Sequence, residues 1–254
     1  MLKIANKNLL SRLFLGTGKF PSDEIMRKCI EESCCEVVTV SMRRMDFSQN
    51  SRDQILQSIP DNIILMPNTS GARTAEEAIL YAELSREVLG VNWIKIEVIP
   101  DPHYLLPDPV ETLKASDELV RKGFVVLPYI NADPVLAKKL EDVGVSAVMP
   151  LGSPIGTNRG IQTKEMIEII IEQAGVPVVI DAGLGRPSDA AQAMEMGADA
   201  VLVNTAIAIS NDPVLMAKAF KTATDSGRWA FECGMPGQNK KAQASSPLTG
   251  FLNV

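Results

Sequence analysis

The sequence predicts an α/β protein folded as a (βα)8 TIM barrel, and three observations support that fold. The chain has 254 residues, of which 46% are hydrophobic and 22% charged, the composition of a globular protein with one large core. Short apolar runs alternate with longer amphipathic segments along the sequence, the pattern of β-α units repeated around a parallel sheet. Eight such units follow one another without a break in composition, which favours a closed barrel over a doubly wound open sheet.

The eight apolar runs, rich in β-branched residues, are expected to form the barrel strands. They cover residues 12–15, 36–40, 63–66, 93–98, 124–129, 147–151, 177–181 and 200–204. The amphipathic segments between them are expected to be helices, and the second of these is short and polar. They cover residues 22–33, 51–59, 74–89, 109–121, 134–142, 164–174, 188–196 and 213–224.

Several of these helices begin with recognisable caps. Thr74 is followed three residues later by Glu77, the spacing of a capping box. Asp108, Asp133 and Asp212 each precede a proline, which places Asp at the N-cap and Pro at the first helical position. These residues predict where four of the helices start.

The domain organisation follows from composition. No Pro/Gly/Ser-rich linker interrupts the β-α units, so residues 1–233 are expected to form a single barrel domain with a short N-terminal lead-in. Residues 234–254 are rich in glycine, proline and polar residues, with no helical or strand periodicity. They are expected to be a C-terminal tail or arm that orders only against a partner.

Charge and hydropathy exclude several partners. Asp and Glu number 31 against 25 Lys and Arg, a formal net charge of -6, so no nucleic-acid surface is expected. No run approaches the roughly 18 apolar residues of a membrane span, and the N-terminus lacks the apolar core of a signal peptide. We therefore expect a cytoplasmic protein that does not bind membranes.

Cysteine and histidine are too sparse for several kinds of site. The four cysteines, Cys29, Cys34, Cys35 and Cys233, show no C-x-x-C spacing, so reduced thiols are expected rather than disulfides or a zinc site. With His103 as the only histidine, neither a Ser-His-Asp triad nor a His-rich metal site is predicted. The chemistry must come mainly from Lys, Asp, Glu and backbone groups.

The run 93–98, Trp-Ile-Lys-Ile-Glu-Val, carries two charges on one face of a strand. Its apolar residues should face the surrounding helices, which turns Lys95 and Glu97 into the barrel. Burial is expected to lower the pKa of Lys95 towards about 7 to 8, giving a neutral amine that forms a Schiff base with a ketone. Glu97 would then transfer protons. A Lys–Glu ion pair that only fills the barrel fits the same pattern.

Asp181 adds a third charge at the same end of the barrel. It ends the run 177–181, and active sites of TIM barrels lie at the carboxyl ends of the strands. An aspartate before a glycine-rich turn also fits a turn residue that accepts backbone hydrogen bonds. The meeting of Asp181 with Lys95 and Glu97 at one mouth favours the acid-base role.

Glycine-rich loops follow three of the last strands. Residues 182–185 read Ala-Gly-Leu-Gly, and Gly183 lets the backbone approach an anion closely. Asn204 and Thr205 add donors after the eighth run, and the loop 152–157 follows the sixth. Each alone fits a simple turn, but three at one rim predict a phosphate site.

Two other signals are weaker. Residues 16–19, Gly-Thr-Gly-Lys, contain part of a phosphate loop but lack its spacing, and Phe20 stands where Ser or Thr is needed. They are interpreted as the first β-α loop. His103 follows the Lys95 strand, so its loop fits both a position beside the site and plain exposure to solvent.

The sequence resembles the thiazole synthase family of bacterial thiamin biosynthesis. The likeness includes Trp-Ile-Lys-Ile-Glu-Val at 93–98 and Asp-Ala-Gly-Leu-Gly-Arg-Pro at 181–187, and it runs through nearly the whole chain. The matching segments are 38–44, 67–78, 93–98, 106–109, 148–156, 181–191 and 202–208. The chain differs from the usual family pattern at 157–164 and 233–236.

The resemblance implies an enzyme, a sulfur-transferring transferase, in which Lys95 forms an imine with 1-deoxy-D-xylulose 5-phosphate. Glu97 and Asp181 match the family's acid-base residues. Its phosphate and substrate contacts match Gly156, Ala182, Gly183, Asn204 and Thr205. The family takes sulfur from the thiocarboxylate of a small sulfur carrier protein and condenses the product with dehydroglycine, made by a separate enzyme, to give a thiazole phosphate carboxylate. The resemblance further implies a homo-oligomer, and no metal or cofactor.

Three other functions fit parts of the pattern. A class I aldolase or phosphosugar isomerase would use a Schiff-base lysine with a phosphate rim on the same barrel. A flavin-binding barrel would use the phosphate loops alone. A docking scaffold for the sulfur carrier would use neither, and the intact Lys, Glu, Asp and glycine set argues against it.

Overall fold

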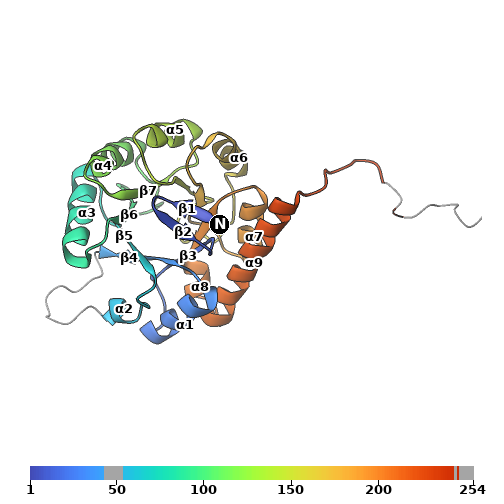
Figure 1. The fold of residues 1–254 in the computed structure, drawn as a ribbon, viewed down its shortest axis with the longest axis horizontal. Helices are drawn as coiled ribbons and strands as arrows, with labels where there is room; N and C mark the ends of the chain where they lie inside the picture. Colours follow the sequence, from blue (N-terminus) through green and yellow to red (C-terminus); the bar gives the residue numbers. More distant parts are fainter. Residues whose placement is uncertain (43–53, 243–244, 246–254) are drawn as a thin grey trace, which may run out of the picture.

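Parallel strands form the wall of a barrel and helices surround it (Figure 1). The computed structural model describes residues 1–42, 54–242 and 245. Within them, all eight predicted strands are present, with bounds that differ by one or two residues at most ends. They are β3 (Leu13–Gly16), β4 (Val37–Ser41), β5 (Ile64–Asn68), β6 (Trp93–Ile96), β7 (Val125–Ile130), β8 (Met149–Pro150), β9 (Val179–Ile180) and β10 (Ala200–Val203).

The sheet closes on itself. Its strands follow the order β8-β7-β6-β5-β4-β3-β10-β9, and each pairs in parallel with its neighbours. The two ends of that order also meet, because Val148 bridges Val178 and Leu151 bridges Asp181 in parallel. The predicted (βα)8 barrel is therefore confirmed, and the carboxyl ends of all eight strands lie at one rim.

The helices follow the predicted order. They are α1 (Asp23–Ser33), α2 (Gln54–Gln57), α3 (Ala75–Leu89), α4 (Pro109–Arg121), α5 (Pro134–Asp142), α6 (Lys164–Gln173), α7 (Pro187–Glu195), α8 (Thr205–Ala208) and α9 (Pro213–Cys233). The helix predicted at 51–59 is short, as its polar sequence suggested, and residues 51–53 lie outside the described residues. So do Arg43 and Arg44, which end the first segment of the family resemblance.

Two helices differ from the prediction. The short α8 was expected to be part of a loop, and α9 continues past residue 224 to Cys233. Asp225, Ser226 and Gly227 are poor helix formers, which is why the sequence pattern weakens there. The structure gives Gly227 a reason to be in a helix: a Cβ atom at this position would lie 2.3 Å from the carbonyl oxygen of Ala191 on α7. Close packing of α9 on α7 therefore outweighs local propensity.

The helix starts were predicted correctly from the caps. Asp108, Asp133 and Asp212 each accept a backbone hydrogen bond at the start of their helices, with proline next in the chain. Thr74 Oγ1 accepts from the backbone nitrogen of Glu77. The box is not reciprocal, because Glu77 Oε2 accepts from the backbone nitrogen of Arg73, one residue before the cap, at 2.7 Å.

An antiparallel hairpin precedes the barrel, where only a lead-in was expected. Its strands are β1 (Leu2–Ile4) and β2 (Lys7–Leu9). The apolar side chains of the hairpin are buried against residues at the amino ends of the barrel strands, including Val37, Trp93 and Ala200. Figure 1 shows the hairpin over the centre of the barrel. It covers the amino end of the barrel, opposite the rim at which the strands end.

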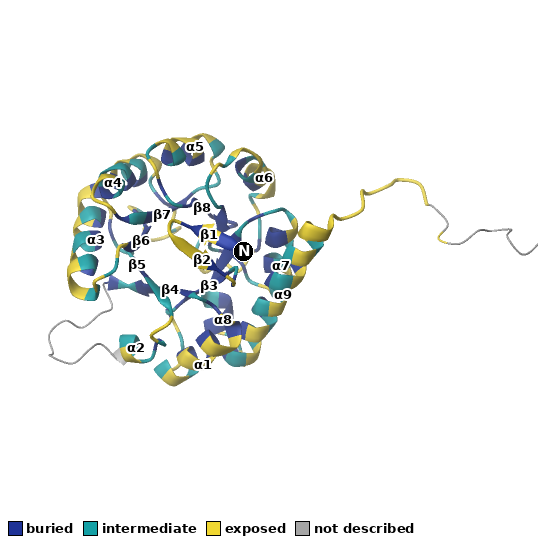
Figure 2. Cartoon of the chain, in the orientation of Figure 1, coloured by how far each residue is buried: buried dark blue, intermediate teal, exposed yellow. Residues whose placement is uncertain are grey.

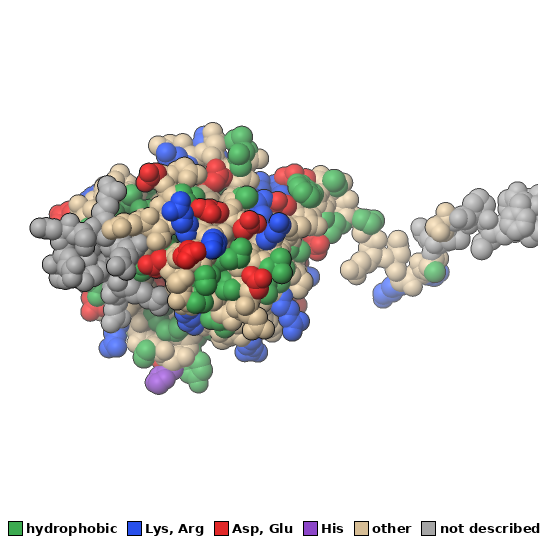
Figure 3. All heavy atoms as spheres, turned by 90° about the horizontal axis from the view of Figure 1, so that it is seen from below, with side chains coloured by type: hydrophobic (Ala, Val, Ile, Leu, Met, Phe, Trp, Pro, Cys, Tyr) green, Lys and Arg blue, Asp and Glu red, His purple; other side chains and the backbone are tan. Residues whose placement is uncertain are grey.

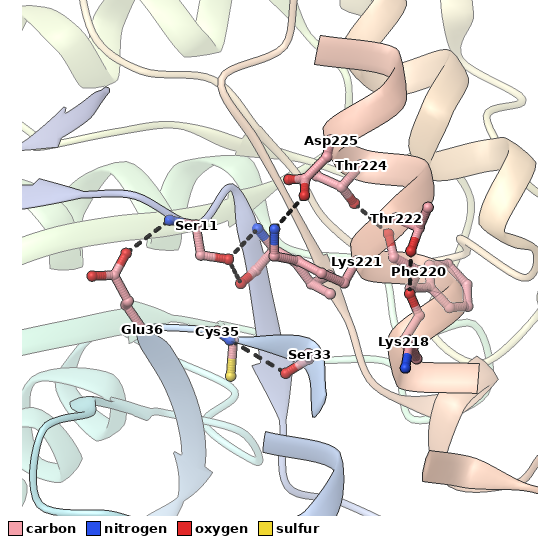
Figure 4. A network of polar contacts seen from close by, with 11 residues as sticks. Ser11, Ser33, Cys35, Glu36, Lys218, Phe220, Lys221, Thr222, Thr224 and Asp225 are labelled. Atoms are coloured by element: carbon pink, nitrogen blue, oxygen red, sulfur yellow. Dashed lines mark hydrogen bonds and ion pairs between the residues drawn. The ribbon is translucent and has the colours of Figure 1, made fainter. Parts of the chain in front are cut away.

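Polar contacts fix the starts of β3 and β4 (Figure 4). The backbone nitrogen of Ser11 donates to Glu36 Oε2 at 2.8 Å, and Ser11 Oγ accepts from the backbone nitrogen of Leu13 at 3.3 Å. In the same view, Thr224 Oγ1 of α9 donates to the carbonyl oxygen of Phe220 at 2.8 Å. A buried hydroxyl is thus satisfied within its own helix, and a carboxylate joins two neighbouring strands.

The surface follows the expected pattern of a barrel. Each long helix buries the face towards the strands and exposes the other (Figure 2). Acidic and basic side chains are interspersed on the side seen in Figure 3. Among the helices of the described residues, none has the length and apolar character that crossing a membrane requires.

Helix α9 ends at Cys233, where the C-terminal tail was expected to begin. The residues that follow, as far as 242, are exposed and form neither helix nor strand. Residues 243–244 and 246–254 lie outside the described residues. The division into a barrel domain, 1–233, and a tail, 234–254, therefore stays a prediction.

The hairpin gives a test of the closed amino end. Leu9 is 2% exposed against the barrel floor, whereas its neighbour Leu10 is 78% exposed. We expect Leu9→Ala to lower the free energy of unfolding by about 2–5 kcal/mol because it leaves a cavity in a packed core. Leu10→Ala, the matched control, should change it by no more than about 0.5 kcal/mol. Equal effects in urea denaturation would show that the hairpin does not seal the barrel.

Candidate active site

Strand β6 turns its charged residues into the barrel, as predicted. Ile94, Ile96 and Val98 pack outward in one apolar cluster with buried residues of α3 and α4, such as Ala78 and Ala115. Lys95 and Glu97 lie on the opposite face, where they are only 4% and 5% exposed. The period of two along the strand therefore fixes both orientations.

Asp181 joins them from the end of β9. Lys95 Nζ lies 3.1 Å from Glu97 Oε1 and also forms an ion pair with Asp181 Oδ2. Asp181 is 2% exposed, so all three charges are shielded from solvent. The predicted meeting of these residues is confirmed, whereas their roles in chemistry stay predictions.

The two carboxylates reverse the expected direction of the Lys95 pKa. Burial is the largest single effect and lowers the pKa of Lys95, since a charged ammonium is less stable away from water. The charges of Asp181 and Glu97 and their hydrogen bonds together outweigh burial, so the pKa of Lys95 lies above its ordinary value. The expectation of a pKa near neutrality is therefore wrong for the protein by itself. A neutral amine requires that one carboxylate accept the lysine proton.

Asp181 has the free capacity to accept that proton. Its Oδ2 atom contacts the Lys95 ammonium group, and no other side chain or backbone group in the described residues makes a hydrogen bond to it. A carboxylate oxygen that lies against the ammonium group and has no other donor among the described residues is placed to accept the lysine proton.

Thr69 holds Glu97 in place, and the sequence did not single it out. Thr69 Oγ1 accepts from the backbone nitrogen of Glu97 and donates to its carbonyl oxygen, both at 2.8 Å. Strand β6 ends at Ile96, so the Thr69 hydroxyl makes the hydrogen bonds to the Glu97 backbone that a neighbouring strand would otherwise make. Thr69 follows the end of β5, and Glu97 follows the end of β6. The sequence gave no sign that they meet, since threonine after a strand is an ordinary loop residue.

Tyr129 of β7 is a second residue that was missed. Its ring centre lies 5.4 Å from Lys95 Nζ, and its hydroxyl donates to the carbonyl oxygen of Leu105 at 3.4 Å. Burial, followed by the negative charges of Asp181 and Glu97, raises the pKa of Tyr129. It is therefore a neutral neighbour of the ammonium group, and within an apolar strand it looked like ordinary core.

A cavity of about 300 Å³ opens above these residues at the carboxyl rim. All five residues predicted to bind substrate line it: Gly156, Ala182, Gly183, Asn204 and Thr205. Other lining residues were not predicted, although several end strands or begin the loops after them. They include Thr17, Lys19, Thr39, Ser41, Asn68 and Ser70. Asn68 ends β5 and pairs with Lys95 in the sheet register, which only the structure shows.

Gly183 is required by a contact within the protein. A Cβ atom there would lie 1.9 Å from Ser153 Oγ and 2.6 Å from the Ser153 carbonyl oxygen, and the φ angle of Gly183 is +76°. The Gly183 carbonyl accepts from the backbone nitrogen of Gly160 at 2.8 Å. Glycine therefore locks the loop after β9 against the loop after β8, in addition to the expected approach to an anion.

Asn204 joins the loop after β10 to the loop after β3. With its amide nitrogen turned towards them, it donates to the carbonyl oxygens of Gly16 at 3.1 Å and Gly18 at 2.7 Å. A Cβ atom at Gly16 would lie 2.6 Å from Asn204 Cβ, so glycine is needed there. The side-chain nitrogen of Asn204 is thus used within the protein, while Asn204 still lines the cavity, and its contact with substrate stays a prediction.

His103 lies apart from this site. It is exposed and does not line the cavity, although Leu105 of the same loop does. Across residues 1–42 and 54–242, no group of three or more His, Cys, Asp and Glu side chains is placed to hold a metal ion. The arrangement suits lysine imine chemistry, with two carboxylates as proton acceptors.

Residues 3–247 match the family described as "Thiazole biosynthesis protein ThiG". The chain is 58% identical over 253 residues to a Vibrio cholerae protein named thiazole synthase, which covers 100% of this chain and 99% of that protein. It is 61% identical over 252 residues to a thiazole synthase of Syntrophobacter fumaroxidans, which covers 99% of this chain and 98% of that protein.

Solved structures give a similar result. The Amycolatopsis orientalis BexX/CysO complex contains a chain with a TM-score of 0.84 and 32% identity, covering 95% of this chain and 98% of that one. Thiamine phosphate pyrophosphorylase from Pyrococcus furiosus has a TM-score of 0.58 at 13% identity, covering 85% of this chain and 96% of that one. The second likeness shows the barrel fold alone.

The raised pKa of Lys95 can be tested by removing one carboxylate. We expect Asp181→Asn to lower the pKa of Lys95 by about one pH unit or more, because burial then meets less opposing attraction. Acetic anhydride labelling of Lys95 at a series of pH values, followed by peptide mass mapping, would place the labelling midpoint at lower pH in the variant.

Asp117→Asn is the matched control. Asp117 pairs with Arg121 on the outer surface of α4, so its removal should leave the Lys95 midpoint unchanged. A midpoint that is the same in Asp181→Asn and the unmodified protein would contradict the proposed coupling.

Proposed function

The chain belongs to the ThiG family of thiazole biosynthesis proteins, and on that premise we propose how this thiazole synthase performs its reaction. It is an enzyme that transfers sulfur in the formation of a thiazole. Lys95 forms an imine with the C2 ketone of 1-deoxy-D-xylulose 5-phosphate. The observation that carries the proposal is the buried Lys95 ammonium held between Glu97 and Asp181 at the floor of the cavity.

Imine formation begins with a proton transfer. The Lys95 ammonium gives a proton to Asp181, whose Oδ2 atom lies against it with unused acceptor capacity. The neutral amine then adds to the C2 carbonyl, and Asp181 returns its proton to the carbinolamine hydroxyl, which leaves as water to give an iminium ion beside two carboxylates. Because the attraction of two carboxylates raises the pKa of Lys95, the same carboxylates also stabilise the positive iminium that follows.

The iminium prepares the neighbouring carbon for sulfur. A positive nitrogen at C2 acidifies the C3 proton, and a carboxylate removes it to give an enaminol. Return of a proton to C2 places the carbonyl at C3 and leaves Lys95 bound to C2 as an amine. Glu97, fixed by Thr69 through its backbone, is the second acid-base group in reach of this site. A sulfur nucleophile then enters at C3.

We place the phosphate group of the substrate at the carboxyl rim of the barrel. Gly156, Ala182, Gly183, Asn204 and Thr205 line the cavity, and we place the phosphate among their backbone groups. That contact would hold the sugar at a set distance from Lys95, which favours reaction.

Partners follow from the sulfur source. A chain 32% identical to this one is found in the BexX/CysO complex, which supports a protein partner at this barrel. We propose that the partner is a small sulfur carrier with a C-terminal thiocarboxylate, and that a separate enzyme makes the dehydroglycine. The product is the thiazole phosphate carboxylate. A homo-oligomer whose C-terminal arm, 234–254, orders against a partner is part of the same proposal.

We also propose a cytoplasmic location. Cys29, Cys34, Cys35 and Cys233 are all free thiols, which suits a reducing compartment. Burial raises the pKa of Cys29 to about 11 and that of Cys35 to about 12, so both are unreactive at neutral pH.

Trapping the imine tests the assignment of Lys95. Incubation with 1-deoxy-D-xylulose 5-phosphate and borohydride should add one reduced sugar phosphate to the chain, and peptide mapping should place it on Lys95. We expect Lys95→Ala to abolish the adduct in intact-mass spectra. Lys114→Ala, which removes an exposed lysine of α4, should label like the unmodified protein. Full labelling of Lys95→Ala would sink the Schiff-base assignment.

Product analysis separates this reaction from that of an aldolase or isomerase on the same barrel. With thiocarboxylated carrier and dehydroglycine, a thiazole phosphate carboxylate should form. Cleavage or isomerisation of the sugar without any use of sulfur would contradict the proposal even if Lys95 is labelled.

A further inference from the structure

We propose that Lys19 binds the phosphate group of the sugar and makes the site specific for phosphorylated substrates. The inference rests on the proposed function, because it assigns a further residue to the same cavity. Lys19 lies in the loop between β3 and α1, in a sequence that fails the spacing of a phosphate loop. The fold, rather than a local motif, brings it to the site.

Lys19 faces the loop where the phosphate is proposed to bind. It lines the cavity, and a Cβ atom added at Gly156 would lie 3.8 Å from Lys19 Nζ. Gly156 follows β8, Gly183 follows β9 and Asn204 follows β10. In the closed barrel β8, β9, β10 and β3 are consecutive, so Lys19 extends the row of predicted phosphate contacts by one strand.

Charge balance gives Lys19 a role that the other lining residues do not fill. The cavity floor holds one ammonium, Lys95, and two carboxylates, so it is negative overall. A phosphate monoester carries about -1.5 to -2 charges near neutral pH. Of the charged side chains described around the cavity, Lys19 alone lies outside that buried cluster. A cation at the rim offsets the repulsion between floor and phosphate.

Lys19 is available for this contact. Its side chain is exposed, and no carboxylate in the described part of the chain forms an ion pair with it, although ion pairs hold many of the other surface lysines. Its φ angle is +69°, a left-handed conformation that is uncommon for a residue with a side chain. A lysine kept in this backbone position is typical of a functional constraint.

The test compares two sugars that differ only in the phosphate. The probes are 1-deoxy-D-xylulose 5-phosphate and unphosphorylated 1-deoxy-D-xylulose, trapped on Lys95 with borohydride and quantified by intact mass. We expect Lys19→Met to raise the half-saturating concentration of the phosphorylated sugar about ten- to a hundred-fold, the loss of one charge-assisted contact. The value for the unphosphorylated sugar should not change, and Lys19→Arg should largely restore phosphate preference.

Lys7→Met is the matched control. It removes the same charge from the exposed hairpin at the closed end of the barrel, so both sugars should be trapped as in the unmodified protein. If Lys19→Met weakens both sugars equally, it merely disturbs the loop and the inference is overturned. Unchanged trapping of the phosphorylated sugar overturns it as well.

A second measurement separates this inference from the proposed function. Inorganic phosphate is titrated calorimetrically into the unmodified protein and Lys19→Met, which requires no imine. Weaker phosphate binding in the variant supports the role of Lys19 even if no sugar is trapped, and then only the proposed function fails. Equal phosphate affinity in the two proteins, or none in either, overturns the role of Lys19.

Discussion

The contact of Lys95 with Glu97 and Asp181 is the interaction on which the rest of the site depends. Burial by itself lowers the pKa of Lys95, because a charged ammonium is less stable away from water. The two carboxylates keep the lysine charged and hold its proton beside Asp181 Oδ2, which accepts no other hydrogen bond from the described residues. The Lys95 ammonium therefore carries a proton that can pass directly to Asp181 when a ketone binds. Proton transfer between Lys95 and Asp181 and formation of the iminium leave the total charge of the buried groups unchanged.

The closed barrel makes that contact possible, because the three residues come from two strands that are far apart in the sheet. Lys95 lies on β6, Glu97 directly after it, and Asp181 directly after β9, so their contact crosses the interior and requires closure between β8 and β9. The β1–β2 hairpin shuts the opposite end. Glycine at 183 leaves room for Ser153, and glycine at 16 leaves room for the side chain of Asn204. Each feature helps to keep water away from the charges and leaves one open rim.

The sequence predicted what depends on local pattern. Alternation along residues 93–98 placed Lys95 and Glu97 correctly, and the caps placed the starts of α4, α5 and α9. What it missed depends on distances between strands. The direction of the Lys95 pKa follows from the approach of Asp181, and the roles of Thr69 and Tyr129 follow from neighbours on other strands. The hairpin was missed because its strands have three residues each and are stabilised by the barrel floor.

The central claim is that Lys95 and its two carboxylates activate C3 of the sugar before any sulfur enters. Exchange in D2O tests it directly, with 1-deoxy-D-xylulose 5-phosphate as the only substrate and proton NMR as the readout. The account predicts that the C3 proton is replaced by deuterium with the unmodified protein and is retained with Lys95→Ala. Retention of the C3 proton with the unmodified protein, while an adduct on Lys95 is trapped by borohydride, would contradict it.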